Sequence, residues 1–534
     1  MKKRPFKERY PTLRSFLKGD GKCKYIGDRY IEGTNIYDRR EWRGVADTAY
    51  DFGWWLLTWV KMGAFVAKNP VRIARAFWRY RWLSSYLVAP HMVDKWIAGD
   101  RGLMLRCDRH ALNAMISDSV DILWKMIRAD RKLGETKWTD KTIAFDYTLP
   151  RHIMMGFPGY DSVNINQQCA FMLPLMIKQM GAYYIDQSVS VGIPQDMCTL
   201  PLTEVGVAVE HEYPDLGNCW LCTNNPCDAN MMDNAVMYRE LSDNGRKAVH
   251  AFVTPLMYDD PTTKELAVHE VYSAIGFLEE QLGEKFDWDA FAQGLERVNQ
   301  VTREELERWD IYATTNTIGM NGVCQGFFRI YFYQQSANKY FDRESAKILR
   351  LFYKGVKHGI NTVPYGRHRA VMWSCGSTYN CQVAAWLYNC WGIVPVINMD
   401  SLTGHNLVDT TDRDTMISDV ADWYCRTPMR THTVGGNRHI LQVFETARKF
   451  NCDMIIMYDD IGCKGMAGCQ GLIEEEFRRH SDEFHICWLP HALMDYRTVP
   501  PAEARKAVND YMRTVLGEEP LDPTLEVFDD DAGW

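Results

Sequence analysis

Hydrophobic and polar positions alternate along much of the chain in a way that predicts two successive sets of strands and helices. Short apolar runs bounded by polar turns are typical of buried strands, whereas apolar positions spaced three and four apart indicate helices. In the first set, strands are expected at residues 182–186, 219–222 and 248–253, with helices over 173–180, 229–240, 265–282 and 288–313. Such an alternation is typical of a parallel sheet in an α/β domain.

A second set begins near residue 360. Its strands are expected at residues 370–373, 393–398, 454–458 and 485–489, with helices near 380–391, 438–450, 471–479 and 502–516. We therefore predict the α/β fold class, with two doubly wound parallel-sheet domains of the Rossmann or flavodoxin-like kind over residues 151–355 and 356–534. A cleft between two such domains is a common place for a functional site.

Residues 1–150 show little strand pattern and are predicted to form a helical, aromatic-rich N-terminal region. Residues 108–131 have the spacing of an amphipathic helix. The apolar segment 52–67 is too short to cross a membrane, which takes about 20 apolar residues. It is therefore interpreted as a buried or interface helix.

Three arginines in this region share one predicted helix face. Arg72, Arg75 and Arg79 are spaced by three and four residues, which places them side by side on a helix. One interpretation is a solvated face or a subunit contact. The other is a substrate-binding patch for the phosphates of coenzyme A, because guanidinium groups form charge-assisted hydrogen bonds with phosphate.

The composition of the chain argues against several classes of protein. A net charge of −8 argues against a general nucleic-acid binder, which needs a broad basic surface. The 16 cysteines in 534 residues are too sparse for a disulfide scaffold. The first residues are charged and no apolar stretch follows them, so we expect no signal peptide. The prediction is a cytoplasmic protein with reduced thiols that binds neither nucleic acid nor membrane.

The candidate chemistry lies in cysteines near the ends of predicted strands. Cys219, Cys222 and Cys227 lie close together, and Cys198 and Cys463 lie in loops elsewhere. Thiolates are the usual ligands of soft transition metals and iron–sulfur clusters. The densely spaced ferredoxin pattern is missing, so the ligands of a cluster would have to come from separate loops. Zinc binding and a dithiol redox pair are the alternatives for the Cys219-x-x-Cys222 segment.

Two further residues are secondary candidates for catalysis. Ser374 follows a predicted strand and is interpreted either as a nucleophile or oxyanion contact or as part of a plain turn. His405 lies past the end of the next predicted strand and either faces the cleft or is structural.

Five segments of the chain, in this order, are similar to motifs of one protein family. They are QDMCT at residues 195–199, LCTNNPCD at 221–228, KHGINTVP at 357–364, YDDIGCKG at 458–465 and LMDYR at 493–497. On these segments the chain resembles the 2-hydroxyacyl-CoA dehydratase and benzoyl-CoA reductase family, and within it the larger, alpha-type subunits of 2-hydroxyglutaryl-CoA dehydratase. The resemblance covers roughly residues 150–515.

This resemblance implies two doubly wound α/β domains that hold one [4Fe–4S] cluster in their cleft. The implied ligands are Cys198, Cys227 and Cys463, with Cys222 and Cys169 as secondary candidates, and one iron is left open to water, a thiol or the substrate carbonyl. The implied partners are a homologous second subunit, which makes a heterodimer, an acyl-CoA substrate and a separate ATP-dependent activator that donates electrons. The chain has no G-x-x-x-x-G-K-[ST] loop, so it is not expected to be the activator itself.

The implied enzyme is an oxygen-sensitive lyase of anaerobic metabolism. The β-proton of a 2-hydroxyacyl thioester is too weakly acidic for ordinary loss of water. One electron on the thioester carbonyl produces a ketyl radical, which expels the α-hydroxyl and acidifies the β-proton. In the ring-reducing branch of the family, an oxidoreductase, the same reducing power enters an aromatic CoA ester.

One segment of the chain departs from the sequence pattern of the family, so alternative functions remain open. Before Gly181, the dehydratases have a Ser-rich segment followed by a Pro and an acidic residue. Residues 167–174 here are QQCAFMLP, with neither the serines nor the carboxylate, and Cys169 lies in their place. Cys169 is therefore a secondary catalytic candidate, and it is interpreted either as a cluster neighbour or as a packed thiol. The alternatives are a subunit that reduces an aromatic CoA ester, and a non-catalytic electron-transfer or structural subunit.

Overall fold

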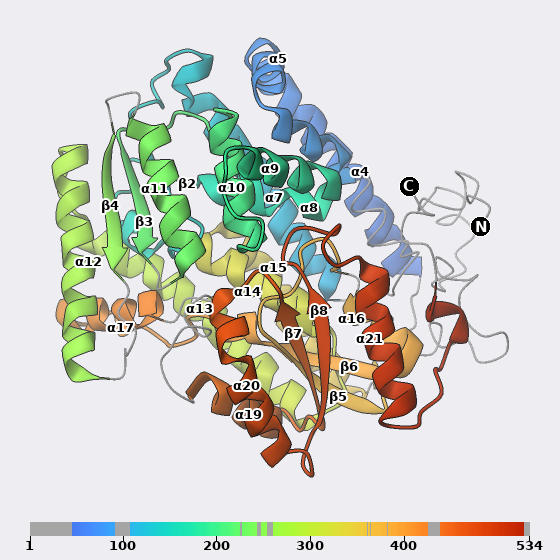
Figure 1. The fold of residues 1–534 in the computed structure, drawn as a ribbon. Coiled ribbons are helices and arrows are strands. Elements are labelled where there is room, and N and C mark those ends of the chain that lie inside the picture. Colours follow the sequence, from blue (N-terminus) through green and yellow to red (C-terminus); the bar gives the residue numbers. More distant parts are fainter. Residues whose placement is uncertain are drawn as a thin grey trace.

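The computed structural model describes residues 45–90, 107–224, 227–242, 247–253, 260–359, 361–363, 365–381, 383–425 and 438–527. The first 44 residues of the predicted N-terminal region lie outside this range, as do positions 225, 226, 360 and 364 of the motif segments. The described chain forms two four-stranded parallel sheets surrounded by helices, with further helices at its N-terminal side (Figure 1). The prediction of an α/β fold with two parallel-sheet domains and a helical N-terminal region is confirmed.

The first sheet consists of β1 (Thr142–Phe145), β2 (Asp161–Asn164), β3 (Cys219–Asn224) and β4 (Ala248–Val253), in the order β2-β1-β3-β4. All its neighbours pair in parallel. Strands β3 and β4 were predicted, whereas β1 and β2 were not. Strand β1 precedes residue 151 and still lies inside the sheet, so part of this sheet comes from the segment predicted as the N-terminal region.

The predicted strand at residues 182–186 is wrong, because this segment belongs to helix α9 (Lys178–Ser190). Its buried residues include Gly181, Tyr184 and Ser188, whose spacing of three and four places them on one helix face. Helix α10 (Thr199–Val209) packs on that face. A Cβ atom at Gly206 would lie 1.9 Å from the Tyr184 carbonyl oxygen, so only glycine permits this approach.

The second sheet consists of β5 (His368–Trp373), β6 (Ile393–Asn398), β7 (Met454–Asp460) and β8 (His485–His491), in the order β6-β5-β7-β8. All four strands were predicted. Alternate residues face two cores: Met372 packs into a separate cluster with α21, while Val371 packs into the main core. The central residues of β5, β6 and β7 are buried and apolar on both faces, as is typical of parallel sheets. Alternate residues of the edge strand β8 are only partly buried.

Both sheets have the same strand order, which is that of flavodoxin-like folds. The first and third strands of each sheet are neighbours, β1 beside β3 and β5 beside β7. In such sheets ligands bind at the carboxyl ends of these two strands, where the strand order reverses.

Helices make up most of the rest. On the N-terminal side are α4 (Val45–Lys68), α5 (Pro70–Arg79), η2 (Arg81–Val88), α7 (Asp108–Ala129) and η3 (Arg131–Leu133). Around the first sheet and beyond it are η4 (His152–Gly156), η5 (Gln167–Phe171), α8 (Leu173–Met176), α9, α10, α11 (Asp228–Ser242), α12 (Pro261–Leu282), α13 (Trp288–Thr314), α14 (Gly322–Gln334) and α15 (Lys339–Lys357). Around the second sheet are α16 (Val383–Trp386), η6 (Leu387–Trp391), η7 (Met399–Leu402), α17 (Arg413–Cys425), α19 (Arg438–Lys449), α20 (Lys464–Arg479), α21 (Pro501–Thr514) and η8 (Pro523–Leu525).

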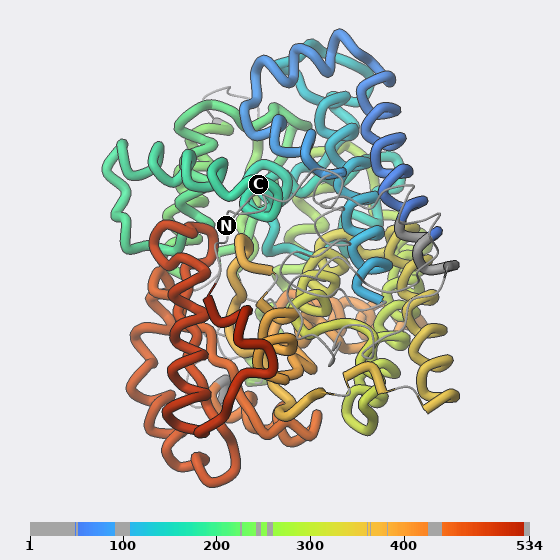
Figure 2. Tube along the Cα trace, turned by 90° about the vertical axis from the view of Figure 1, so that its right-hand side faces the viewer, coloured from blue at the N-terminus to red at the C-terminus, as the bar shows by residue number. Residues whose placement is uncertain are grey.

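Helix α7 lies in the interior, since most of its residues are buried. It packs against α4, α14 and α15. In the turned view of Figure 2, the N-terminal helices (blue) and the C-terminal segment (red) lie on opposite sides of the molecule. Among the described helices, none is long and apolar enough to cross a membrane.

The segment that joins α9 to α10 meets the loops that follow β7 and β8. The Met494 N–H donates to Thr199 Oγ1 at 2.8 Å, and Arg497 pairs with Asp186 at 2.9 Å. One main core includes residues of both sheets. The carboxyl ends of the second sheet are thereby fixed against the first.

Candidate metal centre

Three cysteines lie at the starts of three helices that come from distant parts of the chain. Cys198 is the N-cap residue of α10, Cys227 directly precedes α11, and Cys463 is the N-cap residue of α20. Their carbonyls accept hydrogen bonds from the N–H groups four residues later, at 3.3, 3.0 and 2.9 Å respectively. All three residues therefore belong to the polar N-terminal ends of helices.

The sulfurs of these cysteines also face backbone N–H groups. Burial raises the pKa of all three thiols, to about 12 for Cys463, and hydrogen bonds from the first helical turn oppose this rise. The donors are Leu200 for Cys198, Asn230 and Ala229 for Cys227, and Met466 and Gly465 for Cys463. Helix N-termini favour bound anions and thiolates. The sulfurs are thus protonated without a metal and are well placed to lose their protons to one.

The three cysteines converge on one region. Cys227 and Cys463 both contribute to the raised pKa of Cys198 after burial, because a nearby negative charge disfavours its thiolate. A Cβ atom at Gly462 would lie 3.1 Å from the Cys198 Cα, so the loop that carries Cys463 rests directly on Cys198. Lys464 also pairs with Asp196 at 2.5 Å.

A fourth thiol, Cys375, joins this group. Burial and Asp400 raise its pKa well above the usual value, and Cys463 and Cys198 add to the effect. Its sulfur lies 4.0 Å from Asp400 Oδ1. Cys375 was not among the predicted ligands, although a signal was present: it follows β5, the neighbour of the β7 strand that leads to Cys463.

The donor set fits an iron–sulfur cluster. Cys198 is buried, while Cys227, Cys375 and Cys463 are partly buried against the main core. Buried thiolates with N–H donors to their sulfurs are the usual surroundings of such clusters. Cys198, Cys227 and Cys463 would hold it.

Within the described part of the chain, one group of three His, Cys, Asp or Glu residues has all its ligand atoms within 4.8 Å of one another. It consists of His368, Asp453 and His485. These residues stand at the amino ends of β5, β7 and β8, the edge opposite to the thiols. The thiols are more widely spaced than the ligands of a single ion, as a cluster with iron and sulfide between its ligands requires.

The secondary ligand candidates lie outside this group, within β3 and η5. Cys222 is buried within β3, and after burial its pKa is raised by Asp146 and Asp233. Cys169 is fully buried in η5, and after burial its pKa is raised by Asp130 and Glu212. Asp233 also raises the pKa of Cys227, so Cys222 lies on the side of the group near Cys227.

Ser374 directly precedes Cys375 of the four-thiol group, whereas His405 lies away from that group. Ser374 is buried between β5 and Cys375, with φ 73°, a backbone conformation that is uncommon for serine and found at functional turns. The His405 Nδ1–H donates to the Leu402 carbonyl at 2.7 Å, and the ring packs on Trp309. Trp309 also contacts Phe450, which precedes β7, whereas the thiols lie past its carboxyl end.

The three arginines are not brought together. Arg72 is buried, and its guanidinium donates to the carbonyls of Ile127 and Asp130 at 2.6 Å each and of Leu133 at 3.3 Å. Arg75 and Arg79 are exposed on α5. The structure therefore uses Arg72 to attach α5 to the end of α7.

A group of buried acids beside the thiols was also missed in the sequence. Burial and the nearby carboxyl group of Asp233 raise the pKa of Glu204 well above its usual value. Burial raises the pKa of Asp233 to about 7. After burial, Glu204, Cys198 and Cys375 all contribute to the raised pKa of the nearby Tyr147. The pair therefore retains a proton at neutral pH near the thiols.

Comparison with known proteins identifies one family. The family model described as 2-hydroxyglutaryl-CoA dehydratase, D-component, matches residues 168–504. The match includes all four thiols of the group and the whole second sheet. No curated protein matches the chain.

Proposed function

The chain belongs to the 2-hydroxyglutaryl-CoA dehydratase D-component family, and we propose that it is the [4Fe–4S] subunit of an oxygen-sensitive radical 2-hydroxyacyl-CoA dehydratase. The observation that carries the proposal is the convergence of Cys198, Cys227 and Cys463, each at a helix N-terminus. The family name describes a dehydratase, which is a lyase. In the proposed reaction a 2-hydroxyacyl-CoA loses water to give the 2-enoyl-CoA, and the electron that starts it is returned at the end.

When bound, such a cluster supplies single electrons of low potential. The chain's own contribution is to place N–H donors on the sulfurs, which stabilises the anionic thiolates. Apolar surroundings keep water away and strengthen these interactions. The Glu204–Asp233 pair is one buried acid suited to exchange a proton near the centre, and Asp400 and Asp460 beside Cys375 are two others.

The proposal includes a homologous second subunit, a separate ATP-dependent activator and an acyl-CoA substrate. The proposed α/β domains are built on the two sheets, the first extended to include β1 (Thr142–Phe145) and the second over residues 356–534, with the cluster between them. The binding of CoA phosphates is not assigned to Arg72, because its guanidinium is buried and donates to three backbone carbonyls.

An electron-transfer subunit is the second candidate. It is favoured by Cys375, which lies beside the three helix-capping cysteines, and by the buried QQCAF segment of η5 in place of the family's serines. In that case the partner subunit would carry out the dehydration. A subunit reducing an aromatic CoA ester is the other alternative from the sequence, and no structural feature favours it.

The proposal is tested by anaerobic purification and metal analysis. The protein is expected to be brown and to hold iron and sulfide at about four each per chain. Single Ser variants of Cys198, Cys227 and Cys463 are each expected to lose most of the iron, whereas the matched control Cys390→Ser is expected to keep it. Cys390 is fully buried on the far side of the second sheet. Full iron content in the triple variant would refute the cluster assignment.

The reaction is tested with the partner and the activator present. Enoyl-CoA formation from a 2-hydroxyacyl-CoA is expected from the wild-type complex and is expected to stop in the cysteine variants. If the variants in this chain lose iron and dehydration continues at the partner's own centre, this chain is a structural subunit, neither catalytic nor an electron carrier.

A further inference from the structure

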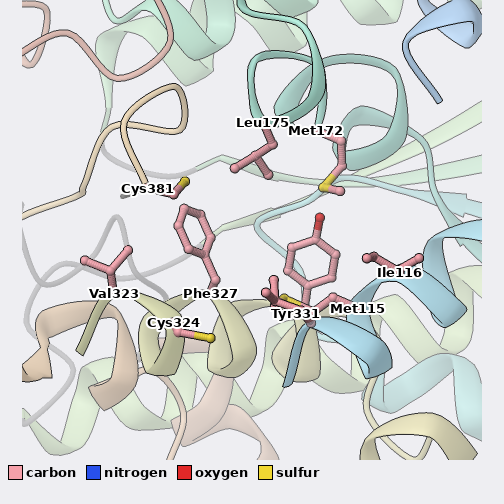
Figure 3. Close-up of a pocket in the computed structure, with 10 residues that line it drawn as sticks. Met115, Ile116, Met172, Leu175, Val323, Cys324, Phe327, Tyr331 and Cys381 are labelled. Atoms are coloured by element: carbon pink, nitrogen blue, oxygen red, sulfur yellow. The ribbon is translucent and has the colours of Figure 1, made fainter. Parts of the chain in front are cut away.

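Two features of the described chain lie outside the four-thiol group. One is an apolar cavity of about 40 Å³ between α7, α8 and α14 (Figure 3). None of the residues that line it carries a charge, and the rings of Phe171 and Tyr147 separate it from the thiols, so it is interpreted as a gap in the core packing. The other is the group of His368, Asp453 and His485, whose ligand atoms lie within 4.8 Å of one another.

Three neighbouring strands carry this group. His368 is the first residue of β5, Asp453 directly precedes β7, and His485 is the first residue of β8. Strand β7 pairs with both β5 and β8. The His485 N–H donates to the Asp453 carbonyl at 2.8 Å, and the Asp453 N–H donates to the Arg369 carbonyl at 3.1 Å. The sheet therefore fixes the backbone at all three positions.

The side chains of the group converge from these positions. The rings of His368 and His485 have centroids 5.4 Å apart and are nearly perpendicular, at 85°. Oδ1 of Asp453 accepts from the Arg369 N–H at 2.7 Å, which leaves Oδ2 facing His368 Nδ1 at 2.7 Å. The carboxylate is thus oriented by the backbone, with one oxygen directed at the imidazole.

A second carboxylate lies on the other side of the same imidazole. Oε1 of Glu518 is 2.9 Å from His368 Nε2, and the other oxygen of Glu518 pairs with Arg367 at 3.2 Å. A histidine that binds a metal through one nitrogen usually donates the N–H of its other nitrogen to a carboxylate or carbonyl. Glu518 occupies the place of such an outer partner.

The donor atoms and their exposure suit one class of ion. Two imidazoles and one carboxylate are typical ligands of Zn²⁺ and related ions, whereas Mg²⁺ and Ca²⁺ prefer oxygen ligands throughout. Ligand atoms around one tetrahedral Zn²⁺ lie about 3.4 Å apart, given bonds of about 2.1 Å. The side chain of Asp453 is 48% exposed and His485 is exposed. An ion can therefore enter from solvent, and both side chains can turn to reach it.

We propose that His368, Asp453 and His485 bind one Zn²⁺, or a related divalent ion such as Co²⁺, at this edge of the sheet. The ion takes the side of the His368 ring that faces Asp453, and the Nε2–H donates to Glu518. Because Glu518 belongs to the segment that follows α21, the ion fastens this segment to the starts of three strands. Its role is structural. Without the ion, the ring keeps its hydrogen bonds with both carboxylates.

The first experiment titrates the full-length, anaerobically purified protein with Co²⁺, whose visible absorption reports the type of donor atom. One ion per chain is expected, with the spectrum of nitrogen and oxygen ligands and no sulfur-to-cobalt charge-transfer band. His485→Asn is expected to weaken this binding by about 100-fold or more, since it removes a ligand and not only an outer partner. The side chain is exposed, so this variant is expected to fold.

The matched control is His269→Asn, because His269 is an exposed histidine on α12 outside the group. It is expected to bind Co²⁺ as the wild type does. Equal affinity in His485→Asn and the wild type, or a spectrum of sulfur ligation alone, would overturn the inference. Asp453→Asn, a second ligand variant, is expected to weaken binding as His485→Asn does, and unchanged binding there would overturn it as well.

The second experiment tests the class of ion and the part of Glu518. Zn²⁺ is expected to displace Co²⁺, and excess Mg²⁺ is not; equal displacement by Mg²⁺ would overturn the inference. Glu518→Gln is expected to weaken Co²⁺ binding about tenfold with an unchanged spectrum. Unchanged affinity in this variant would overturn the link to the C-terminal segment.

The inference does not depend on the proposed function, because no thiol takes part in the site. His485→Asn is therefore expected to keep the iron and sulfide content of the wild type. Failure of the cluster assignment would appear in the sulfide content, whereas failure of this site would appear in the Co²⁺ titration.

Discussion

Cys198, Cys227 and Cys463 each stand at the start of a helix and also supply a sulfur to the candidate metal centre. The cysteine carbonyl accepts the first helical hydrogen bond, and the sulfur receives the N–H groups that the first turn leaves unpaired. These donors are part of every helix N-terminus, so the anionic site needs no additional cationic side chain. Cys375 lies in a loop without such a helix start, which distinguishes it from the other three.

Gly462 gives a test of the contact between the two domains at the centre. A Cβ atom there would lie 2.9 Å from the Met197 carbonyl oxygen and 3.1 Å from the Cys198 Cα. Since both are backbone atoms, Gly462→Ala is expected to displace the loop, lower the iron content and destabilise the fold by about 1–3 kcal/mol. Iron analysis and urea unfolding measure the two effects.

The matched control for this test is Gly468→Ala, in α20 of the same segment. A Cβ atom at Gly468 would meet nothing within 4 Å, so alanine is expected to stabilise the protein by about 0.5–1 kcal/mol. Equal iron content in both variants would show that the loop contact is unimportant for the centre.

The variant Cys375→Ala tests whether Cys375 is a ligand of the proposed cluster or only lies beside it. Because Cys375 lacks a helix start, the variant is expected to keep its full iron content and to change the electron paramagnetic resonance spectrum and the reduction potential of the cluster. Loss of about a quarter of the iron or more would instead identify Cys375 as a fourth ligand. That result would favour the electron-transfer candidate, since no iron would be open to substrate.

At the scale of elements, the longer strands and helices were predictable and the short ones were not. Strands β1 and β2 have four residues each, which is too short for a period to be recognised. The segment 182–186 is apolar enough for a strand, and its helical state depends on the approach of α10 to Tyr184. That contact is made by Gly206, which lies too far along the chain to affect the hydrophobic periodicity of residues 182–186.

Helix α5 shows why a predicted face does not define a site. Its arginines have the expected helical spacing, but burial of Ile73 and Ala76 turns Arg72 inward. The guanidinium then satisfies backbone carbonyls at the end of α7. No local pattern distinguishes such an arginine from one that binds phosphate, because the partners are carbonyls that any residue carries.

Arg72→Ala is therefore expected to affect stability rather than CoA binding. It leaves three carbonyls without their donor in a buried place, at a cost of about 2–4 kcal/mol. Arg75→Ala, on the exposed side of the same helix, is expected to change the free energy of unfolding by less than about 0.5 kcal/mol. Urea unfolding measures both, and calorimetry with an acyl-CoA is expected to show the same affinity for each. A weaker affinity in Arg72→Ala at unchanged stability would restore the phosphate-binding interpretation.

At the scale of the whole molecule, the two sheets repeat one plan. Both have the same strand order, and Cys227 and Cys463 follow the third strand of their own sheet. The sequence predicted the two domains and these two cysteines at strand ends. Cys198 was also expected at a strand end, but it precedes α10 and follows α9. Its place at the centre depends on the packing of the two domains, which the sequence pattern does not encode locally.

The C-terminal segment is bound near the amino ends of the strands of the second sheet, opposite to the thiols. The Leu521 N–H donates to the Cys390 carbonyl at 2.6 Å. His368, the first residue of β5, lies between Asp453 Oδ2 at 2.7 Å and Glu518 Oε1 at 2.9 Å. Its imidazole therefore joins the start of β7 to the chain after α21, on the side away from the thiols.

This histidine makes part of the stability depend on pH. The hydrogen bond with Asp453 raises the pKa of His368, burial opposes the rise, and Glu518 supports it. A group whose pKa is raised by folding stabilises the protein fully below its unfolded value, about 6.5, and this contribution is lost as the pH rises through the folded value. We expect His368→Gln to lower the free energy of unfolding more at pH 6 than at pH 9, measured by urea unfolding at both. Glu518→Gln is expected to reduce the same difference in part, because the imidazolium keeps Asp453. An equal loss at both pH values would show that the ring acts as a neutral hydrogen-bonding group, and the C-terminal segment would then be held by its backbone contacts alone.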